Sequence, residues 1–318
     1  MTIRTYWQLD VADDPARSER GARLSGLFRD VRPTTLNRYD YYAQVAQAAA
    51  QTGFDGLFLP HRPESDDAAI VAAAIAREAP RLMLIPEFPA SAGSAVYAAK
   101  QAVSFQRQTH ERLGWAIASP GYAAARARDG DHVSEEDLYA RVEEFLTVAR
   151  GVHSEHSFDF AGKHFEVRGG GFVAPLNRVP FPKVFLQGES EEALALSAQA
   201  ADVHLFAAAP LPDLRSRVET LDTLALRAGR TVEFGLIQPV LARDDADDAR
   251  RDAERAGLPA GAIVGGYDEV ADRLADLATP GFRHFVLGAP SSLEEAYRIG
   301  QRVLPRFRAL SARLAAAA

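Results

Sequence analysis

Gln44 to His61 reads QVAQAAAQTGFDGLFLPH, and this stretch decides the fold. Its first part is rich in Ala and suits a helix, which would end at Gly53, a residue type common just after a last helical turn. The apolar run from Gly56 to Leu59 is too short for a helix, and Pro60 closes it. The stretch therefore predicts a helix, a glycine stop, a buried strand and a polar loop, in that order.

The same pattern returns near the C-terminus, where Ala275 to Pro290 reads ADLATPGFRHFVLGAP. Gly281 and Phe282 repeat the stop, and residues 284–287 repeat the strand. Weaker copies occur at residues 78–86, 109–120 and 199–207. Because the helix always precedes the strand and a loop always follows it, the repeats indicate a chain of alternating strands and helices.

Eight strand candidates alternate with helices along the chain, at residues 3–9, 56–59, 81–85, 113–118, 183–187, 202–207, 232–238 and 284–287. Parallel strands joined by right-handed crossovers can close into a cylinder. We therefore predict an α/β fold, a (β/α)8 TIM barrel forming one domain over residues 1–318. An open doubly wound sheet is the alternative, but no GxGxxG motif follows the first strand.

Irregular insertions interrupt the alternation. Residues 10–33 are polar and rich in Arg, which predicts a long loop, and long loops in compact domains are usually functional. Residues 119–133 are also predicted as a loop. Within an insertion at about residues 153–182, two alternating runs flank Ala161-Gly162-Lys163 and predict a β-hairpin at 158–167, outside the barrel. Residues 257–266 are expected to form a Gly-rich link.

The composition excludes several classes of protein. The formal charge of -7 over 318 residues is mild and both signs are interspersed, so no binding of nucleic acid or membrane is expected. The chain has no Cys, which excludes disulfides, thiolate metal sites and a Cys nucleophile. No apolar run reaches transmembrane length, and the N-terminus lacks the features of a signal peptide. We expect a cytoplasmic protein with a small-molecule substrate.

Polar residues at the C-terminal ends of the strands are the candidates for chemistry, because the active sites of (β/α)8 barrels lie there. The first strand ends without clustered histidines, so no metal site of a hydrolase is expected. The fourth and seventh strands end in Ser119 and Gln238, which excludes the facing carboxyls of a glycosidase. Glu87 and Glu189 are too few acids for an enolase-like site. Such a set suits a protein whose cofactor carries the chemistry.

The chain resembles the bacterial luciferase-like flavin-dependent monooxygenases, and most of all their alkanesulfonate monooxygenase branch. The resemblance spans nearly the whole chain and rests on residues 53–60 (GFDGLFLP), 159–169 (DFAGKHFEVRG), 181–190 (FPKVFLQGES) and 285–300 (FVLGAPSSLEEAYRIG). The second of these stretches is the most specific. The resemblance implies a (β/α)8 barrel with an inserted hairpin, reduced FMN delivered by a separate flavin reductase, O2 as co-substrate, and a homodimer or homotetramer.

The resemblance also implies where the cofactor binds. In this family the turn after the fifth strand holds the FMN phosphate, and in this sequence that turn runs from Gln187 through Gly188 to Ser190. Tyr139 matches a family Tyr that reaches the phosphate. Ser119, which ends the fourth strand, completes the predicted cofactor-binding residues.

Two candidate catalytic residues follow the second strand. His61 would face the isoalloxazine or the substrate, although a single His is more often structural or solvated. Ser65 stands where the sulfonate branch carries a Cys in its flavin site, and its alternative role is to cap the helix that begins there.

Two interpretations of the turn at Ser190 also stay open. The free N–H groups at a helix start would bind a phosphate, or Ser190 would merely cap the helix while Glu191 and Glu192 complement its dipole. In the first case Glu189 would face the phosphate with an unfavourable charge.

Several sulfonate-branch residues are replaced in this chain, at Ser65, Ala116, Ile237, Pro239 and Pro290, and the mobile Arg-bearing loop between the seventh and eighth strands is absent. The resemblance implies an FMNH2- and O2-dependent two-component monooxygenase acting on a small organosulfur or related compound. The replaced residues leave two alternatives. One is a non-catalytic flavin- or ligand-binding relative, and the other is an F420-dependent oxidoreductase of the same superfamily.

Overall fold

Eight parallel strands close into a barrel in the computed structural model, which describes residues 2–11, 38–121, 123–290 and 292–317. In the order in which they pair, the strands are β1 (Arg4–Gln8), β2 (Gly56–Leu59), β3 (Met83–Phe88), β4 (Gly114–Ile117), β7 (Lys183–Gln187), β8 (Val203–Ala207), β9 (Glu233–Arg243) and β11 (Phe282–Gly288). Because β11 pairs with β1, the sheet has no open edge there and the predicted (β/α)8 barrel is confirmed. The assignment of the chain to one domain stays a prediction.

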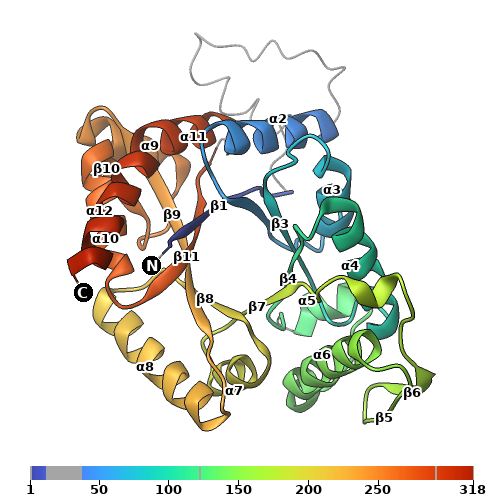
Figure 1. Ribbon diagram of the computed structural model, residues 1–318. Coiled ribbons are helices and arrows are strands. Elements are labelled where there is room, and N and C mark those ends of the chain that lie inside the picture. Colours follow the sequence, from blue (N-terminus) through green and yellow to red (C-terminus); the bar gives the residue numbers. More distant parts are fainter. Residues whose placement is uncertain (1, 12–37, 122, 291, 318) are drawn as a thin grey trace.

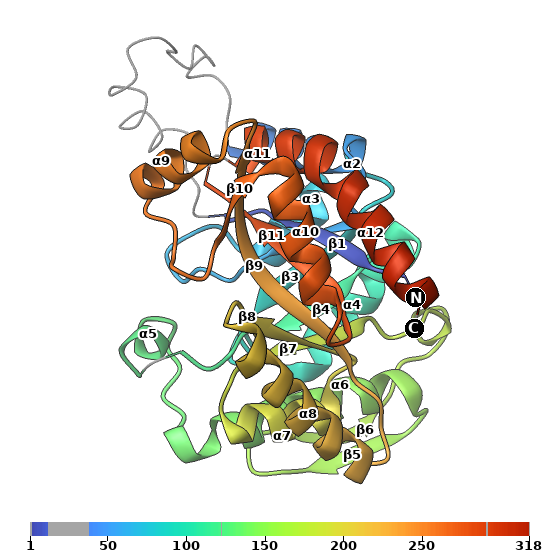
Figure 2. The same ribbon diagram turned by 90° about the vertical axis from the view of Figure 1, so that its left-hand side faces the viewer.

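Helices surround the barrel, as Figure 1 shows. They are α2 (Arg38–Gln51), α3 (Ala68–Ile75), α4 (Ala95–Thr109), α6 (Leu138–Ser154), α7 (Glu191–Ala200), α8 (Leu211–Arg227), α10 (Tyr267–Ala278), α11 (Ser292–Arg298) and α12 (Leu304–Ala317), with a π-helical segment at Ile299–Val303 and short 3-10 turns at Glu135–Asp137 and Leu176–Arg178. Figure 2 shows the loop with helix α5 (Ala123–Arg128) on one side of the barrel and the N-terminus on the other.

The turn between α2 and β2 joins the first repeat to both ends of the chain. Gly53 has a φ of +90°, a conformation that favours glycine. The carboxylate of Asp55 accepts hydrogen bonds from Thr5 N of β1 at 2.7 Å and from Arg308 Nη2 of α12 at 3.0 Å. The GFDG sequence is therefore structural, because it fixes β2 against the first strand and the last helix.

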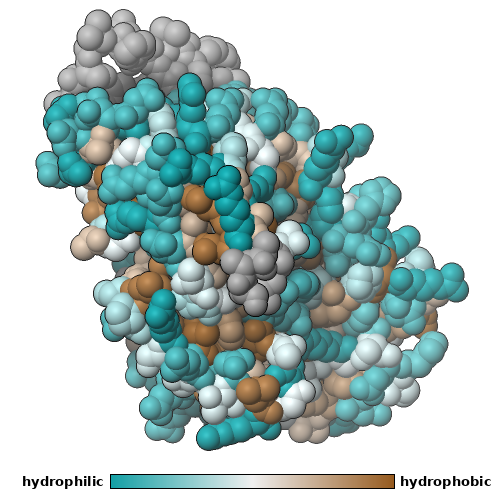
Figure 3. Space-filling model, turned by 60° about the vertical axis from the view of Figure 1, so that its left-hand side comes forward, coloured by the Kyte–Doolittle hydropathy of each residue, from teal (hydrophilic) through white to brown (hydrophobic). Residues whose placement is uncertain are grey.

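The barrel interior is packed with apolar side chains. Tyr6, Phe58, Ile85 and Phe185 are among the buried residues of this inner cluster. Two polar atoms in this interior, Tyr6 Oη and His284 Nδ1, form a hydrogen bond of 2.8 Å with each other. A second, larger cluster fills the space between the strands and the helices. Hydrophilic residues cover most of the outer face in Figure 3, and hydrophobic residues gather in smaller areas between them.

The inserted hairpin is confirmed and lies outside the barrel sheet. β5 (Phe158–Ala161) and β6 (Glu166–Gly170) pair in antiparallel fashion as a separate sheet. The carboxylate of Glu144, on α6, accepts hydrogen bonds from the backbone N–H groups of Lys163 and His164 at 2.8 and 2.7 Å. A Cβ at Gly162 would lie 2.4 Å from the same carboxylate. The GKH sequence thus attaches the hairpin to α6.

The chain departs from the sequence-based expectations in four places. β3 extends to Phe88 rather than ending at residue 85, and α5 occupies part of the expected loop at 119–133. The expected link at 257–266 contains β10 (Ile263–Gly266), which pairs in parallel with the second half of β9. Asp67, not Ser65, caps α3, because its carboxylate accepts the N–H of Ile70 at 2.8 Å. The expected loop at 10–33 lies outside the described residues from residue 12 onward.

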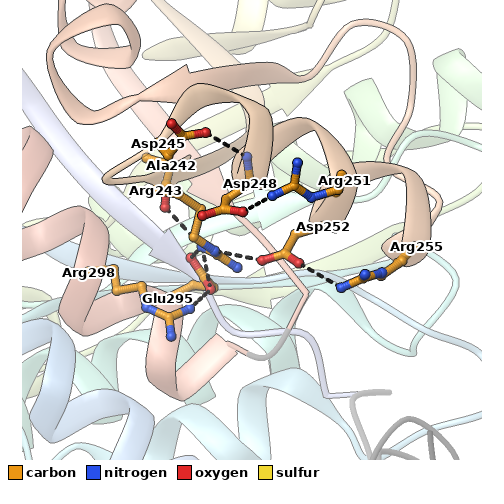
Figure 4. A network of polar contacts seen from close by, with 9 residues as sticks. All are labelled: Ala242, Arg243, Asp245, Asp248, Arg251, Asp252, Arg255, Glu295 and Arg298. Atoms are coloured by element: carbon orange, nitrogen blue, oxygen red, sulfur yellow. Dashed lines mark hydrogen bonds and ion pairs between the residues drawn. The ribbon is translucent and has the colours of Figure 1, made fainter. Parts of the chain in front are cut away.

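An ion-pair network fixes the long strand β9 to two helices (Figure 4). The guanidinium of Arg243, at the end of β9, lies 2.7 Å from Asp252 of α9 (Ala246–Ala256) and 3.0 Å from Glu295 of α11. Glu295 is buried and also contacts Arg298 at 2.5 Å. Because its charge is shared by two guanidiniums, this buried carboxylate is compensated.

Gly56 provides a test of how closely β2 and β3 must approach. A Cβ at Gly56 would lie 2.4 Å from the backbone oxygen of Met83, which neither strand can avoid without moving. We expect Gly56→Ala to lower the free energy of unfolding by about 3 kcal/mol, measured by urea denaturation. As a control, Gly266→Ala adds a Cβ with no atom within 4 Å, and its expected cost is at most about 1 kcal/mol, the preference of an N-cap for Gly. Equal costs would contradict the proposed constraint.

Candidate active site

A cavity of about 210 Å3 lies at the C-terminal ends of β2, β3, β4 and β7, beside α5 and α6. The apolar part of its lining includes Pro89, Ala90 and Val142. Its polar lining comes from the strand ends, from the segments after β3 and β4, and from α6; these residues are His61, Glu87, Ser91, Ser119, Arg126, Asp129, Asp131, Arg141 and Gln187. The structure therefore brings together three residues that the sequence singled out, His61, Ser119 and Gln187.

Glu87 connects the ends of three strands. One carboxylate oxygen, Oε2, accepts the backbone N–H of His61 at 2.8 Å, and the other, Oε1, accepts a hydrogen bond from Nε2 of Gln187. Glu87 is only 5% exposed, and this burial raises its pKa to about 7, although the His61 N–H and the charge of Arg62 act in the opposite direction. The sequence placed Glu87 at a strand end, but it gave no sign of these partners.

Ser119 and Gln187 are also connected to each other. The Ser119 hydroxyl donates a hydrogen bond of 2.8 Å to the backbone oxygen of Gln187, which joins the ends of β4 and β7. The His61 ring also lines the cavity, with Nε2 3.7 Å from the Asp129 carboxylate. Ser65, in contrast, is not among the residues that line this cavity, so the structure does not bring it to the other candidates.

A buried ion pair fixes the segment after α5 to α6. Asp131 accepts two hydrogen bonds from the Arg141 guanidinium, both of 2.7 Å, in a bidentate arrangement. These hydrogen bonds hold the pKa of Asp131 below its usual range, against the effect of burial. The sequence analysis missed this pair, because residues ten positions apart on two elements carry no spacing signal.

The turn predicted to bind phosphate brings two hydroxyl groups together. Ser190 caps α7, because its Oγ accepts the N–H of Ala193 at 3.2 Å. The same hydroxyl donates to Oη of Tyr139, on α6, at 3.2 Å. A Cβ at Gly188 would lie 2.7 Å from the Ala193 side chain, so this position requires glycine. A small space of about 10 Å3 beside them is lined by Ser119, Tyr139 and Gln187, and it adjoins the larger cavity.

Glu189, which would face a phosphate with an unfavourable charge, has a cationic partner in the structure. Its carboxylate lies 2.7 Å from Nη1 of Arg217, on α8, and both side chains are partly exposed. Because the guanidinium offsets the carboxylate charge, Glu189 would repel a phosphate less than the sequence suggested. Residues 28 positions apart meet here because α7 and α8 are neighbours in the barrel.

Among the described residues, no group of three or more His, Asp or Glu side chains is placed to hold a metal ion. Within the same part of the chain, no helix combines the length and the apolar character needed to cross a membrane.

A family model described as luciferase-like monooxygenase matches residues 21–261 of the chain. This match covers the strands whose ends form the cavity and the turn at the start of α7.

Three solved structures show the same fold at low sequence identity. A riboflavin lyase, solved with modified FMN and riboflavin, is 18% identical with a TM-score of 0.79, over 97% of this chain and 92% of that chain. EDTA monooxygenase from Chelativorans sp. BNC1 is 19% identical with a TM-score of 0.78, over 98% and 94%. The coenzyme F420-dependent tetrahydromethanopterin reductase from Methanopyrus kandleri is 14% identical with a TM-score of 0.75, over 96% and 100%. At these identities the likeness concerns the fold alone.

The buried pair at the cavity wall gives a stability test with a defined pH dependence. Asp131→Asn leaves the Arg141 charge buried without a counter-ion, and we expect it to cost about 3 kcal/mol near neutral pH. Because the pKa of Asp131 is lowered on folding, the wild type should lose this advantage as the pH falls below about 4. Urea denaturation of the wild type and of Asp131→Asn, near neutral pH and below about pH 4, measures the difference in their free energies of unfolding.

The matched control for this pair is Glu166→Gln, which removes a carboxylate from the exposed contact with Arg168. Its expected cost is below about 0.5 kcal/mol. A small, pH-independent effect of Asp131→Asn would show that the buried pair does not stabilise the site.

Proposed function

The chain belongs to the luciferase-like monooxygenase family, and from this premise we propose that it is a flavin-dependent monooxygenase. It would use reduced FMN, supplied by a separate flavin reductase, together with O2, and act on a small organosulfur or related compound. The observation that carries the proposal is the pair of hydroxyls at the start of α7, which adjoins the polar cavity at the strand ends.

The chemistry of this turn fits a phosphate group. Ser190 and Tyr139 supply two hydroxyls 3.2 Å apart, and the backbone N–H groups at the start of α7 are partial positive charges. Gly188 lets the backbone pack closely at this point. Glu191 and Glu192 in the first turn oppose a phosphate, whereas the charge of Glu189 is offset by Arg217. Hydroxyl and backbone donors together support a phosphate site here.

The remaining residues would orient the rest of the cofactor and the substrate. Reduced flavin, when bound, supplies the oxidation chemistry, so the chain need not provide a metal or a nucleophile. Gln187 is hydrogen-bonded to both Ser119 and Glu87, so these residues have fixed positions in the cavity lining. The His61 ring, which lines the same cavity, is the proposed contact for the substrate or the flavin ring.

The closeness to the alkanesulfonate branch remains part of the proposal. The same applies to a homodimer or homotetramer and to a cytoplasmic location. Ser65 stays a proposed catalytic residue, although it does not line this cavity.

An F420-dependent oxidoreductase is the second candidate, supported by the fold match to an F420-dependent reductase. Its hydride chemistry would need no O2. A non-catalytic relative that binds flavin or another ligand is the remaining alternative, suggested by the replaced family residues.

Anaerobic titration with FMNH2, FMN and F420, followed by fluorescence quenching, separates these functions. We expect FMNH2 to bind with a dissociation constant on the order of micromolar or below. Binding of F420 alone would favour the second candidate. Failure of all three to bind would contradict both enzyme proposals and leave the ligand-binding relative.

Two hydroxyl deletions test whether the phosphate lies at the start of α7. Tyr139→Phe and Ser190→Ala should each weaken FMN binding about tenfold or more, the effect of one lost hydrogen bond to a charged group. Riboflavin, which lacks the phosphate, should bind both variants as it binds the wild type. Ser190→Ala should also lower stability by about 1 kcal/mol through the lost helix cap.

Tyr97→Phe serves as the control for these variants, because Tyr97 is exposed on α4 and does not line the cavity. Tyr97→Phe should change neither the affinity for FMN nor the affinity for riboflavin. Equal losses for FMN and riboflavin, or no loss in either variant, would remove the phosphate from this turn.

A further inference from the structure

Glu87 is an inward-facing carboxyl at the top of the barrel interior. Met83, Ile85 and Glu87 alternate along β3 on the inner face, and the first two pack in the inner apolar cluster. Glu87 follows above this layer and reaches the floor of the cavity at the strand ends. A carboxyl group is costly to bury at this depth unless it is neutral or paired. Its presence therefore needs a reason beyond packing.

The two hydrogen bonds of Glu87 fix its orientation and leave it able to donate. The His61 N–H and the Gln187 amide each donate to a different carboxylate oxygen. A protonated carboxyl can accept both of these hydrogen bonds and still offer its own O–H to a third group. The ionised carboxyl keeps the same two donors. The same two donors thus serve both protonation states, and the O–H of the protonated state is available to a third group.

The charged groups around Glu87 are largely engaged with one another. Arg62, after β2, is paired with Asp10, after β1, at 2.6 Å. Across the cavity Arg141 is paired with Asp131 at 2.7 Å. The other charged or titratable groups that line the cavity are the His61 ring, Asp129 and Arg126.

This environment brings the pKa of the Glu87 carboxyl close to neutral pH. Burial raises the pKa of Glu87 from 4.5 to about 7; the His61 N–H and Arg62 lower it, and Asp10 raises it. A group with a pKa near the working pH can both give and take a proton at little cost.

We propose that Glu87 is an acid–base residue of this site, which donates its proton to an oxygen or nitrogen atom of the ligand in the cavity. This inference rests on the proposed function. In the step, the O–H bond of Glu87 breaks and a new O–H or N–H bond forms on the ligand. The electron pair stays on the Glu87 carboxylate, which the His61 N–H and the Gln187 amide stabilise. Water in the cavity returns the proton, so no further reactant is needed.

The first experiment observes the proton of Glu87 in the ligand-free protein. Infrared difference spectra of the wild type and Glu87→Gln, from about pH 5 to about pH 9, should show a protonated-carboxyl C=O band that belongs to Glu87. The band should disappear with a midpoint near pH 7. Glu295→Gln, which removes another buried carboxyl away from the cavity lining, is the control and should leave this band unchanged. A midpoint at the ordinary Glu value would overturn the inference.

Two variants that each remove one charge near Glu87 should shift this midpoint in opposite directions, which tests its electrostatic origin. Arg62→Met removes the positive charge and should raise the midpoint by about half a pH unit, and Asp10→Asn should lower it by a similar amount. Shifts in the same direction would overturn the inference.

Stability gives an independent check, because a raised pKa makes the wild type lose stability relative to Glu87→Gln as the pH rises from 4.5 to about 7.

The second experiment tests whether ligand binding changes the protonation of Glu87. Calorimetric titration of the wild type with FMN, in buffers of different ionisation enthalpy near pH 7, should reveal proton exchange that Glu87→Gln lacks. FMN binding with the same proton exchange in both proteins would overturn the inference and leave the proposed function intact. If FMN binds to neither protein, the proposed function fails and the coupling to flavin fails with it. The infrared titration then still decides whether Glu87 carries an exchangeable proton.

Discussion

Closure of the barrel through the pairing of β1 with both β2 and β11 is the constraint on which the site depends. Closure fixes the register of all eight strands, and the register decides which side chains point inward at the mouth. Glu87 and Gln187 lie on β3 and β7, which are separated by β4, yet they meet across the mouth and form a hydrogen bond. Because the interior beneath them is packed, a ligand in this cavity would lie at the mouth of the barrel rather than inside it.

Charge compensation determines the character of the site. The side chains of Asp131 and Glu189 are each engaged by a guanidinium, from Arg141 and Arg217. Glu87 instead has neutral partners, a backbone N–H and an amide. A buried carboxyl with neutral donors keeps a raised pKa, whereas one with a cation does not. The mouth of the barrel therefore combines ion pairs in its walls with a buried carboxyl, Glu87, whose hydrogen-bond partners are neutral.

The sequence predicted the barrel because local signals repeat along it. The limits of β2 and β7 were predicted to the residue, because Gly, Pro and turn residues bound compact apolar runs. β10 was missed, since its four residues end in two glycines and pair only with an extension of β9. The strand ends placed His61, Ser119 and Gln187 correctly near one another. The partners of Asp131, Glu189 and Glu87 could not be predicted, because they meet through tertiary packing between residues on different elements.

A crystal structure of the protein with FMN tests the central claim most directly, which is that one mouth of the barrel holds the cofactor between α7 and Glu87. We expect the phosphate within about 3 Å of Ser190 Oγ and Tyr139 Oη, and the flavin ring in the cavity above Glu87. A phosphate bound away from the start of α7, or a flavin outside the cavity at the strand ends, would contradict this account.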